Sequence, residues 1–311
     1  MIDPFGNVIH ASRDATDKSK IIGKQFIYKN SPSIIKRRKL DRPLDTGIVA
    51  IDAINPIGLG QRQLIIGDRS SGKTSIALSA IINQKDSGLI NIYVAIGQKR
   101  SSIISTYERL KKYGANKNTI IIFSSPDAPA EQFLAPSIGM SIAEIFAYQG
   151  KDVLIILDDL TKHANIYREI SLSIGKNPGR EAYPTDIFFR HSFLLERAGQ
   201  FIDDNELNGG SITALPIVET VQEDVASLIP SNVISITDGQ IFTSVEKYNN
   251  GIFPAIDLKL SVSRTGSSVQ SKQIKKSSKG LKAEYSKLLE VNKFSEISVD
   301  LSKDIKEKIY Q

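Results

Sequence analysis

The residues with the clearest chemistry form a glycine-rich loop that ends in a lysine and a threonine. The loop reads Gly67-Asp68-Arg69-Ser70-Ser71-Gly72-Lys73-Thr74 and fits the pattern G-x-x-x-x-G-K-[ST], which is typical of phosphate-binding loops. An apolar run precedes it and an amphipathic stretch follows, so the loop joins a predicted strand to a predicted helix. The glycines let N–H groups point inward, the lysine reaches the β- and γ-phosphates, and the threonine hydroxyl suits Mg²⁺. The sequence therefore predicts a site for nucleotide phosphates and Mg²⁺.

A second candidate lies at the end of another apolar run, where residues 153–157 are followed by Asp158 and Asp159. In P-loop NTPases, a strand next to the phosphate loop ends in a carboxylate that holds Mg²⁺ through water. We predict that Asp158 fills this role beside Thr74. The alternative is an aspartate that caps the helix after the strand, because a cap has the same local sequence.

Short apolar runs rich in β-branched residues alternate with amphipathic stretches through the middle of the chain. The runs cover residues 64–66, 90–96, 119–123 and 153–157, and the amphipathic stretches cover 74–83 and 101–113. This alternation predicts βαβ units around a mainly parallel, buried sheet, which is an α/β fold. We also expect strands at 211–215 and 233–237 and a helix at 188–198.

The chain divides into three parts by pattern. Residues 1–45 predict an extended lead-in, residues 46–268 one α/β nucleotide-binding domain, and residues 269–311 a short helical C-terminal segment with a helix at 280–294. Residues 270–311 contain ten lysines and six acidic residues and so hold most of the formal charge of +6. Lysines interleaved with glutamates are typical of a solvated helix face, so we expect no nucleic-acid partner.

Composition excludes several kinds of chemistry. The 311 residues include no cysteine and three histidines, so a disulfide scaffold, a thiolate nucleophile and a zinc–sulfur site are excluded, and bound metal would use oxygen ligands. The N-terminus lacks the pattern of a signal peptide, and no run approaches 18 apolar residues. We therefore expect that the chain does not enter a membrane by itself.

Seven ordered segments, spread over nearly the whole chain, resemble the α subunits of the rotary F-type ATP synthases. They cover residues 45–58, 67–74, 93–100, 158–160, 178–184, 231–242 and 261–264. The resemblance implies a RecA-like P-loop NTPase core that binds ATP or ADP with Mg²⁺. It also implies a hexameric ring with a β-type catalytic subunit, a central-stalk-type subunit, and a place on the cytoplasmic side of a membrane, peripheral through the complex.

The resemblance assigns roles to residues outside the loop. Gln98 stands where catalytic β subunits carry a glutamate; an amide orients water but cannot accept its proton, which implies a non-catalytic nucleotide-binding subunit. Glutamine does orient water productively in some GTPases, so slow hydrolysis is the alternative. Arg264 matches the arginine that α subunits extend in trans to the β site, and Ser261 on the same strand end is expected to support it. Glu219 is expected near the phosphates or in an ordinary ion pair.

The chain also departs from the family pattern. Full α subunits begin with a β-barrel domain and continue into a helical bundle, whereas Met1 and Gln311 fall near the inner boundaries of those parts, so we expect a form shortened at both ends. Phe253 replaces an arginine near the adenine, Phe193 replaces another arginine, and the serines of the loop replace glutamine and threonine. We therefore expect the phosphate contacts to be kept and the base pocket to be altered.

Three interpretations remain open. The chain is a piece or a shortened paralogue of an α-type subunit, in a complex that makes or hydrolyses ATP. It is alternatively a RecA-like hexameric helicase or termination factor, although such a protein needs a catalytic glutamate and an RNA-binding domain before the core. A third reading is a gene fragment with an interaction role only, and the intact Lys73, Thr74 and Asp158 argue against it.

Overall fold

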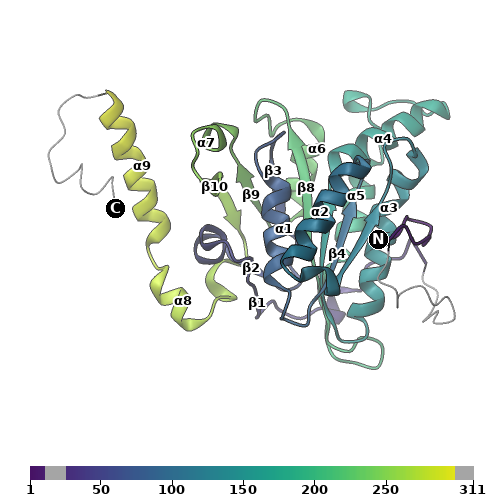
Figure 1. Cartoon of the computed structure of the whole chain (residues 1–311), viewed down its shortest axis with the longest axis horizontal. Coiled ribbons are helices and arrows are strands. Elements are labelled where there is room, and N and C mark those ends of the chain that lie inside the picture. The colour runs from purple at the N-terminus through teal and green to yellow at the C-terminus, as the bar shows by residue number, and fades with distance from the viewer. Residues whose placement is uncertain (11–25, 298–311) are drawn as a thin grey trace.

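A central sheet determines where the phosphate loop lies. The computed structural model describes residues 1–10 and 26–297, and in this part an eight-stranded sheet has the order β10-β9-β3-β8-β6-β4-β5, with β7 paired to β8 (Figure 1). Pairs that involve β10 or β7 are antiparallel and the others are parallel. The strands are β3 (Leu64–Asp68), β4 (Ile90–Ala95), β5 (Thr119–Phe123), β6 (Asp152–Asp158), β7 (Gly199–Gln200), β8 (Ser211–Thr220), β9 (Gly239–Thr243) and β10 (Ile256–Ser263).

Helices cover both faces of this sheet. The helices of the described chain are α1 (Lys73–Asn83), α2 (Arg100–Lys112), α3 (Pro129–Ala147), α4 (Leu160–Ser173), α5 (Ile187–Leu195), α6 (Leu228–Ile236), α7 (Val245–Asn249), α8 (Lys272–Ser277) and α9 (Leu281–Ile297), of which α1 to α6 pack on the sheet. Leu64 and Ile66 of β3 belong to the core under α3 to α6, whereas Ile65 belongs to the core under α1 and α2. The predicted α/β fold with a mainly parallel sheet is confirmed.

Short elements complete the described chain. A two-stranded antiparallel sheet joins β1 (Pro43–Leu44) to β2 (Ile57–Gly58), and short helical turns are η1 (Ile34–Lys36), η2 (Ala50–Ile54), η3 (Ala115–Asn118), η4 (Arg180–Ala182) and η5 (Gly266–Ser268). Outside these turns and bridges, the described parts of 1–45 are mostly irregular.

One predicted strand, at 233–237, is wrong, because these residues form the end of α6 and the strand β9 follows them. Their β-branched side chains favour a strand by propensity. However, Ile229, Val233 and Ile236 are all buried, and their spacing of four and three places them on one face of a helix. Packing of this face overrides the local preference.

The longest helix of the α/β core, α3, has no counterpart among the predicted elements. It contains Pro136 and Gly139, which interrupt a helical pattern, and its apolar residues do not keep to one side. Gly139 has a structural reason, since a Cβ there would lie 2.5 Å from Val94 Cγ2 on the sheet. The predicted helix at 188–198 is confirmed as α5, although it ends at Leu195.

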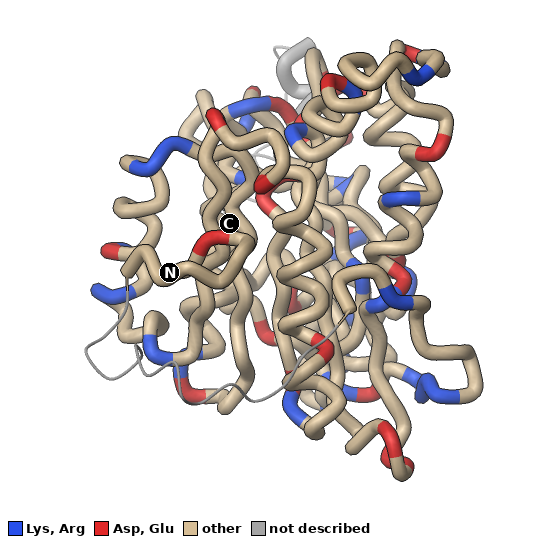
Figure 2. The backbone as a smooth tube through the Cα atoms, turned by 90° about the vertical axis from the view of Figure 1, so that its right-hand side faces the viewer, with Lys and Arg blue, Asp and Glu red and all other residues tan. Residues whose placement is uncertain are grey.

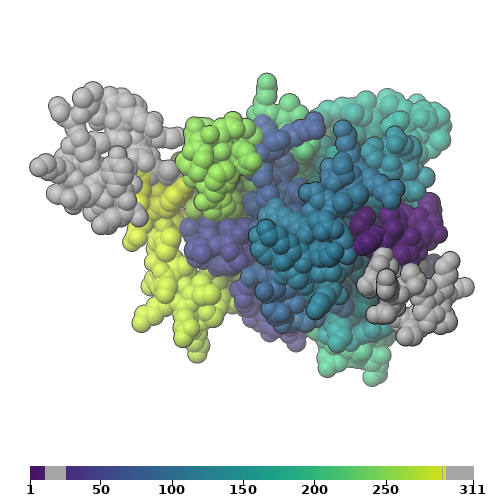
Figure 3. Space-filling model, viewed as in Figure 1, coloured from purple at the N-terminus to yellow at the C-terminus, as the bar shows by residue number. Residues whose placement is uncertain are grey.

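The two ends of the described chain lie at opposite ends of the molecule. The N-terminal residues cover the β5 side, whereas α8 and α9 extend from the β10 side (Figure 3). The predicted C-terminal helix is confirmed as α9, and Lys282 Nζ connects it to the Ser261 carbonyl of β10 over 2.7 Å. The side of the molecule seen in Figure 2 carries basic and acidic residues interspersed.

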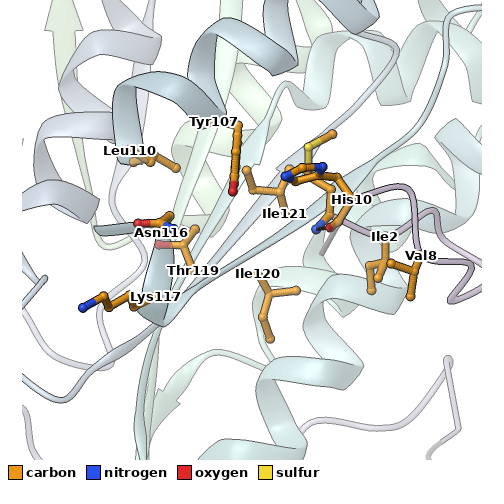
Figure 4. Close-up of a pocket in the computed structure, with 11 residues that line it drawn as sticks. Ile2, Val8, His10, Tyr107, Leu110, Asn116, Lys117, Thr119, Ile120 and Ile121 are labelled. Atoms are coloured by element: carbon orange, nitrogen blue, oxygen red, sulfur yellow. Dashed lines mark hydrogen bonds between the residues drawn. The ribbon is translucent and has the colours of Figure 1, made fainter. Parts of the chain in front are cut away.

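Residues 1–10 lie along the outer edge of β5. Ile2 N–H donates to the Ile121 carbonyl over 2.9 Å, and Phe123 N–H donates to the Ile2 carbonyl over 3.0 Å. A pocket of about 340 Å³ lies between this segment, α2 and the amino end of β5, and His10 and Tyr107 line it (Figure 4). Because the phosphate loop lies at the carboxyl end of β3, this pocket belongs to a different edge of the sheet.

Two buried histidines join α3, α4 and α5. His163 Nδ1 lies 3.2 Å from His191 Nε2, and His163 Nε2 lies 3.2 Å from the Phe133 carbonyl. A carbonyl only accepts, so His163 carries its proton on Nε2 and accepts from His191 Nε2–H. Burial lowers the pKa of His163 to about 4 and that of His191 to about 3, so both rings are neutral at pH 7.

This pair predicts an acid-sensitive fold. Below about pH 6.5 the unfolded chain binds two protons that the folded chain does not, so the free energy of unfolding falls as the pH drops from 6.5 toward 4. In His191→Gln one proton is removed from this balance, and the slope of the unfolding free energy against pH should decrease by up to about 1.4 kcal/mol per pH unit below about pH 6. Urea unfolding between pH 5 and 7.5 measures this. The exposed His10→Gln is the control, and an unchanged slope in His191→Gln would contradict the assignment.

Candidate functional site

The phosphate loop connects β3 to α1 at the carboxyl edge of the parallel strands. Gly72 has a φ of 93°, in the left-handed region, immediately before α1 begins at Lys73. Ser71 Oγ donates to the Asp68 carbonyl over 2.7 Å and lies 2.6 Å from Thr243 Oγ1 of β9. These bonds close the loop upon itself and tie it to the neighbouring strand.

Asp68 holds the loop from the other side. Its Oδ1 accepts hydrogen bonds from Thr220 Oγ1, at the end of β8, and from Glu223 N–H over 2.9 Å. Arg69 and Ser70, at the tip of the loop, are exposed. The loop is thus fixed at its base by β8 and β9 and open at its tip, which leaves its backbone accessible to a ligand.

Lys73 is buried beside the loop carbonyls. Its Nζ donates to the Gly67 carbonyl over 2.9 Å and to the Asp68 carbonyl over 2.6 Å. Burial lowers the pKa of Lys73, and carboxylates led by Glu219 oppose this shift.

Glu219 stands opposite Gly67 in the β3–β8 register, so it lies within β8 and close to the phosphate loop, as expected. Pro216 does not end that strand, contrary to the predicted limit near 215.

A hydrogen-bond network joins the loop to the end of β6. Thr74 Oγ1 donates to Asp158 Oδ2 over 2.9 Å, and Tyr93 OH of β4 donates to the same oxygen over 2.6 Å. Gln98 Nε2 lies 3.2 Å from the Asp158 carbonyl and 3.4 Å from Tyr93 OH. The structure therefore brings together three residues that the sequence singled out, and adds Tyr93.

One of the two aspartates after β6 caps the helix that follows, which is the alternative that the sequence left open for this pair. Asp159 caps α4, because its Oδ1 accepts from Lys162 N–H over 2.7 Å. Asp158 is therefore free of the capping role and faces Thr74. Burial raises the pKa of Asp159 to about 6, although Lys162 opposes the shift and Asp158 adds to it. No group of three or more metal-type side chains from His, Cys, Asp or Glu occurs in the described ranges.

A pocket of about 570 Å³ opens next to the loop. It is lined on one side by Gly72 and Ile76 of the loop and α1, and on the other by Tyr248 and Phe253. The two aromatic rings meet edge to face with centroids 5.3 Å apart, and Phe253 is 67 % exposed. The resemblance to α subunits placed Phe253 near the adenine, at the position of a family arginine, whereas Tyr248 gave no signal in the sequence.

Arg264 lies at the other end of the sheet from the phosphate loop. Its backbone N–H donates to the Asp238 carbonyl over 2.9 Å, next to the residue that begins β9. Thr243, at the end of β9, pairs instead with Gly67 of the phosphate loop. About 13 Å of strand separate these two positions. Arg264 is exposed, and its side chain makes no hydrogen bond or ion pair with the residues described by the structure. It is thus distant from the phosphate loop of its own chain.

Ser261 is buried rather than exposed to solvent. Its hydroxyl accepts from Phe242 N–H over 3.0 Å and donates to the Asp257 carbonyl. These bonds span the irregularity in the β9–β10 pairing between Asp257 and Val262. Any support of Arg264 by Ser261 therefore acts through the shape of the strand.

A phosphate loop at the carboxyl edge of a parallel α/β sheet, with a strand-end carboxylate bonded to its threonine, defines a P-loop nucleotide-binding protein. The sequence profile described as "ATP synthase alpha/beta family, nucleotide-binding domain" matches residues 47–263. The chain belongs to the ATP synthase alpha/beta family.

Curated relatives agree with this family. The chain is 47 % identical to an "ATP synthase subunit alpha" of Ruthia magnifica, over 99 % of the chain and 61 % of the relative. It is 48 % identical to the protein of that name in Caldanaerobacter subterraneus, over 100 % and 60 %, and 52 % identical to that of Mycoplasma capricolum, over 92 % and 54 %. The chain thus spans about three fifths of the first two relatives. Within the described residues, no helix is long and apolar enough to span a membrane.

The loop predicts a strict requirement for glycine at its first position. A Cβ on Gly67 would collide with the side chain and the carbonyl of Thr243, which is held in the sheet, so Gly67→Ala should destabilise the fold. We expect about 1 to 3 kcal/mol more destabilisation than in Gly88→Ala, since overpacking has this magnitude. Gly88 is the control, because its φ is also positive but no atom lies within 4 Å of a Cβ there. Equal unfolding free energies in denaturant titrations would refute this.

Proposed function

We propose that the chain is a non-catalytic, nucleotide-binding α-type subunit of an F-type ATP synthase. The observation that carries the proposal is the 2.9 Å bond between Thr74 and Asp158, beside the buried Lys73 and an accessible phosphate loop. The relatives named ATP synthase subunit alpha support the α-type assignment. These names do not favour a helicase or a termination factor.

ATP or ADP is the proposed ligand. The backbone of residues 67–74 would surround the phosphates, and Lys73 would exchange its two carbonyl partners for phosphate oxygens. Gln98 would lie next to the terminal phosphate, as its contact with Asp158 indicates. The pocket beside Tyr248 would receive the base against an aromatic surface, in place of the arginine that Phe253 replaces.

The side chains at the start of α1 and the end of β6 fit Mg²⁺. Thr74 offers a hydroxyl and Asp158 a carboxylate, and Mg²⁺ prefers oxygen ligands while it keeps several waters. Two protein oxygens beside a phosphate loop are therefore sufficient. When bound, Mg²⁺ would neutralise phosphate charge, and Thr74 and Asp158 would hold it there.

Gln98 supports a site that binds but does not turn over nucleotide. Its amide donates toward Tyr93 and the Asp158 carbonyl, and an amide has no basic group for the proton of an attacking water. Catalysis would instead occur on a β-type subunit, to which Arg264 extends in trans. The exposed position of Arg264, remote from its own phosphate loop, supports this role. Ser261 would fix the strand that presents it.

The proposal includes the assembly. The chain would occupy an alternating ring with β-type subunits around a central-stalk-type subunit, on the cytoplasmic side of a membrane to which only the complex is attached. In this proposal residues 46–268 form the nucleotide-binding domain, between the lead-in 1–45 and the helical segment 269–311.

The first test concerns the loop lysine. Lys73→Ala should weaken the binding of Mg-ADP by about tenfold to a hundredfold, because one charge-assisted hydrogen bond contributes about 1.5 to 3 kcal/mol. Isothermal titration calorimetry on the purified chain measures this. Lys85→Ala, which removes an exposed lysine just after the same helix, is the control and should bind like the wild type. Equal affinity for both variants would exclude the phosphate-loop site.

The second test concerns the arginine in trans. Arg264→Ala should leave nucleotide binding by this chain unchanged and lower hydrolysis by the complex with a β-type subunit by about 10³-fold or more. Arg264→Lys should recover little, because an ammonium lacks the planar fork of a guanidinium. Arg109→Ala on α2 serves as the exposed-arginine control. Full turnover of the Arg264→Ala complex would contradict the role, and a change in the chain's own affinity would indicate a role in cis.

A further inference from the structure

Tyr93 is a polar side chain in an otherwise apolar place. It lies in β4, between β5 and β6, and is fully buried together with its neighbours Ile92 and Val94. A buried tyrosine hydroxyl needs a hydrogen-bond partner, and here the partner is the carboxylate of Asp158 on the adjacent strand. A phenylalanine would fill the same volume without this requirement. The hydroxyl therefore has a purpose other than packing.

The hydrogen bonds to the Asp158 carboxylate show what the Tyr93 hydroxyl does. Oδ2 accepts from both Tyr93 and Thr74, whereas Oδ1 accepts from no described residue. Two donors on one oxygen fix the rotation of the carboxylate and leave its other oxygen available. A tyrosine hydroxyl carries a proton at neutral pH, so Tyr93 is the donor of its 2.6 Å bond to Oδ2.

Gln98 holds the tyrosine in turn. The single hydroxyl proton of Tyr93 goes to Asp158, so the oxygen of Tyr93 accepts from Gln98 Nε2, 3.4 Å away. The same amide nitrogen lies 3.2 Å from the Asp158 carbonyl. The amide thus contacts both the tyrosine and the backbone of the aspartate, and it closes a ring of contacts around the end of β6.

We propose that Tyr93 is a positioning residue that orients Asp158 for the magnesium ion of the bound nucleotide. This inference rests on the proposed nucleotide site, and it adds a residue that touches neither nucleotide nor metal. Its effect is transmitted through Asp158, so it should change the magnesium-dependent part of nucleotide affinity and leave the phosphate-loop part intact.

The test compares ADP binding in excess Mg²⁺ with binding in EDTA, for the wild type and Tyr93→Phe. The affinity for Mg-ADP should fall by about tenfold, the size of one charge-assisted hydrogen bond, and the affinity in EDTA should stay within about twofold. Asp158→Asn should lose the same magnesium-dependent part. The double variant should lose little more than Asp158→Asn, because the two residues act as one unit.

Tyr167→Phe is the matched control. Tyr167 is also a buried tyrosine that donates to a carboxylate, with its hydroxyl 2.7 Å from Asp186, but it lies on α4 outside the site. It should keep the magnesium dependence of the wild type. If Tyr93→Phe is poorly folded, Gln98→Met provides a second variant, since it removes the amide that holds the tyrosine and should reduce the same magnesium-dependent part.

Two failures are distinguishable. If the wild type binds Mg-ADP but Tyr93→Phe keeps its full magnesium dependence, or loses affinity equally with and without Mg²⁺, the positioning role is overturned and the proposed function is kept. If the folded wild type binds no nucleotide in either buffer, the proposed function fails and this inference fails with it.

Discussion

The hydrogen bond between Thr74 and Asp158 is the constraint that the site depends on. β8 separates β3 from β6, so the phosphate loop and the strand-end aspartate do not meet through strand pairing. They meet because α1 crosses this end of the sheet, and its first turn places a hydroxyl against the carboxylate. The register of the parallel strands must therefore be correct across three strands for the two groups to touch, and a slip of one residue would direct Asp158 to the other face.

Burial of the carboxylates at the carboxyl ends of the strands costs free energy, because they carry like charges. Asp158 and Asp159 are adjacent and almost fully buried, and Glu219 faces the same region. Part of this negative charge is compensated by Lys73, by the N-terminus of α4 and by the donors on Asp158. Burial is the main cause that raises the pKa of Asp159 to about 6, and the charge of Asp158 adds to it. In the proposed function, a cation and a phosphate would bind here together more readily than either alone, because each would offset the charge of the other.

The sequence predicted most accurately the segment in which phosphate binding requires particular residue types. The loop at 67–74 needs glycines, a lysine and a hydroxyl, so its position and its flanking elements were predictable. The identity of the helix cap was not predictable, because a cap and a metal-site carboxylate have the same local sequence, and only the Lys162 N–H contact identifies Asp159 as the cap. Tyr93 was hidden within an apolar strand, and α6 was missed because tertiary packing overrode strand propensity. In each case the deciding partner lies far away along the chain.

Arg264 lies beside the amino end of β9, whereas the phosphate loop lies at the carboxyl end of β3. The two groups therefore face opposite ends of the parallel strands, and the molecule is polar along the strand direction. If a chain offers an arginine at one edge and receives a ligand at the other, the contact joins unlike surfaces. Such a heterologous contact leaves a free surface on each partner, so further subunits add until the rotation closes on itself. A two-fold dimer, in contrast, joins like surfaces and ends there. If Arg264 acts in trans as proposed, the polarity of a single sheet favours a closed ring over a pair.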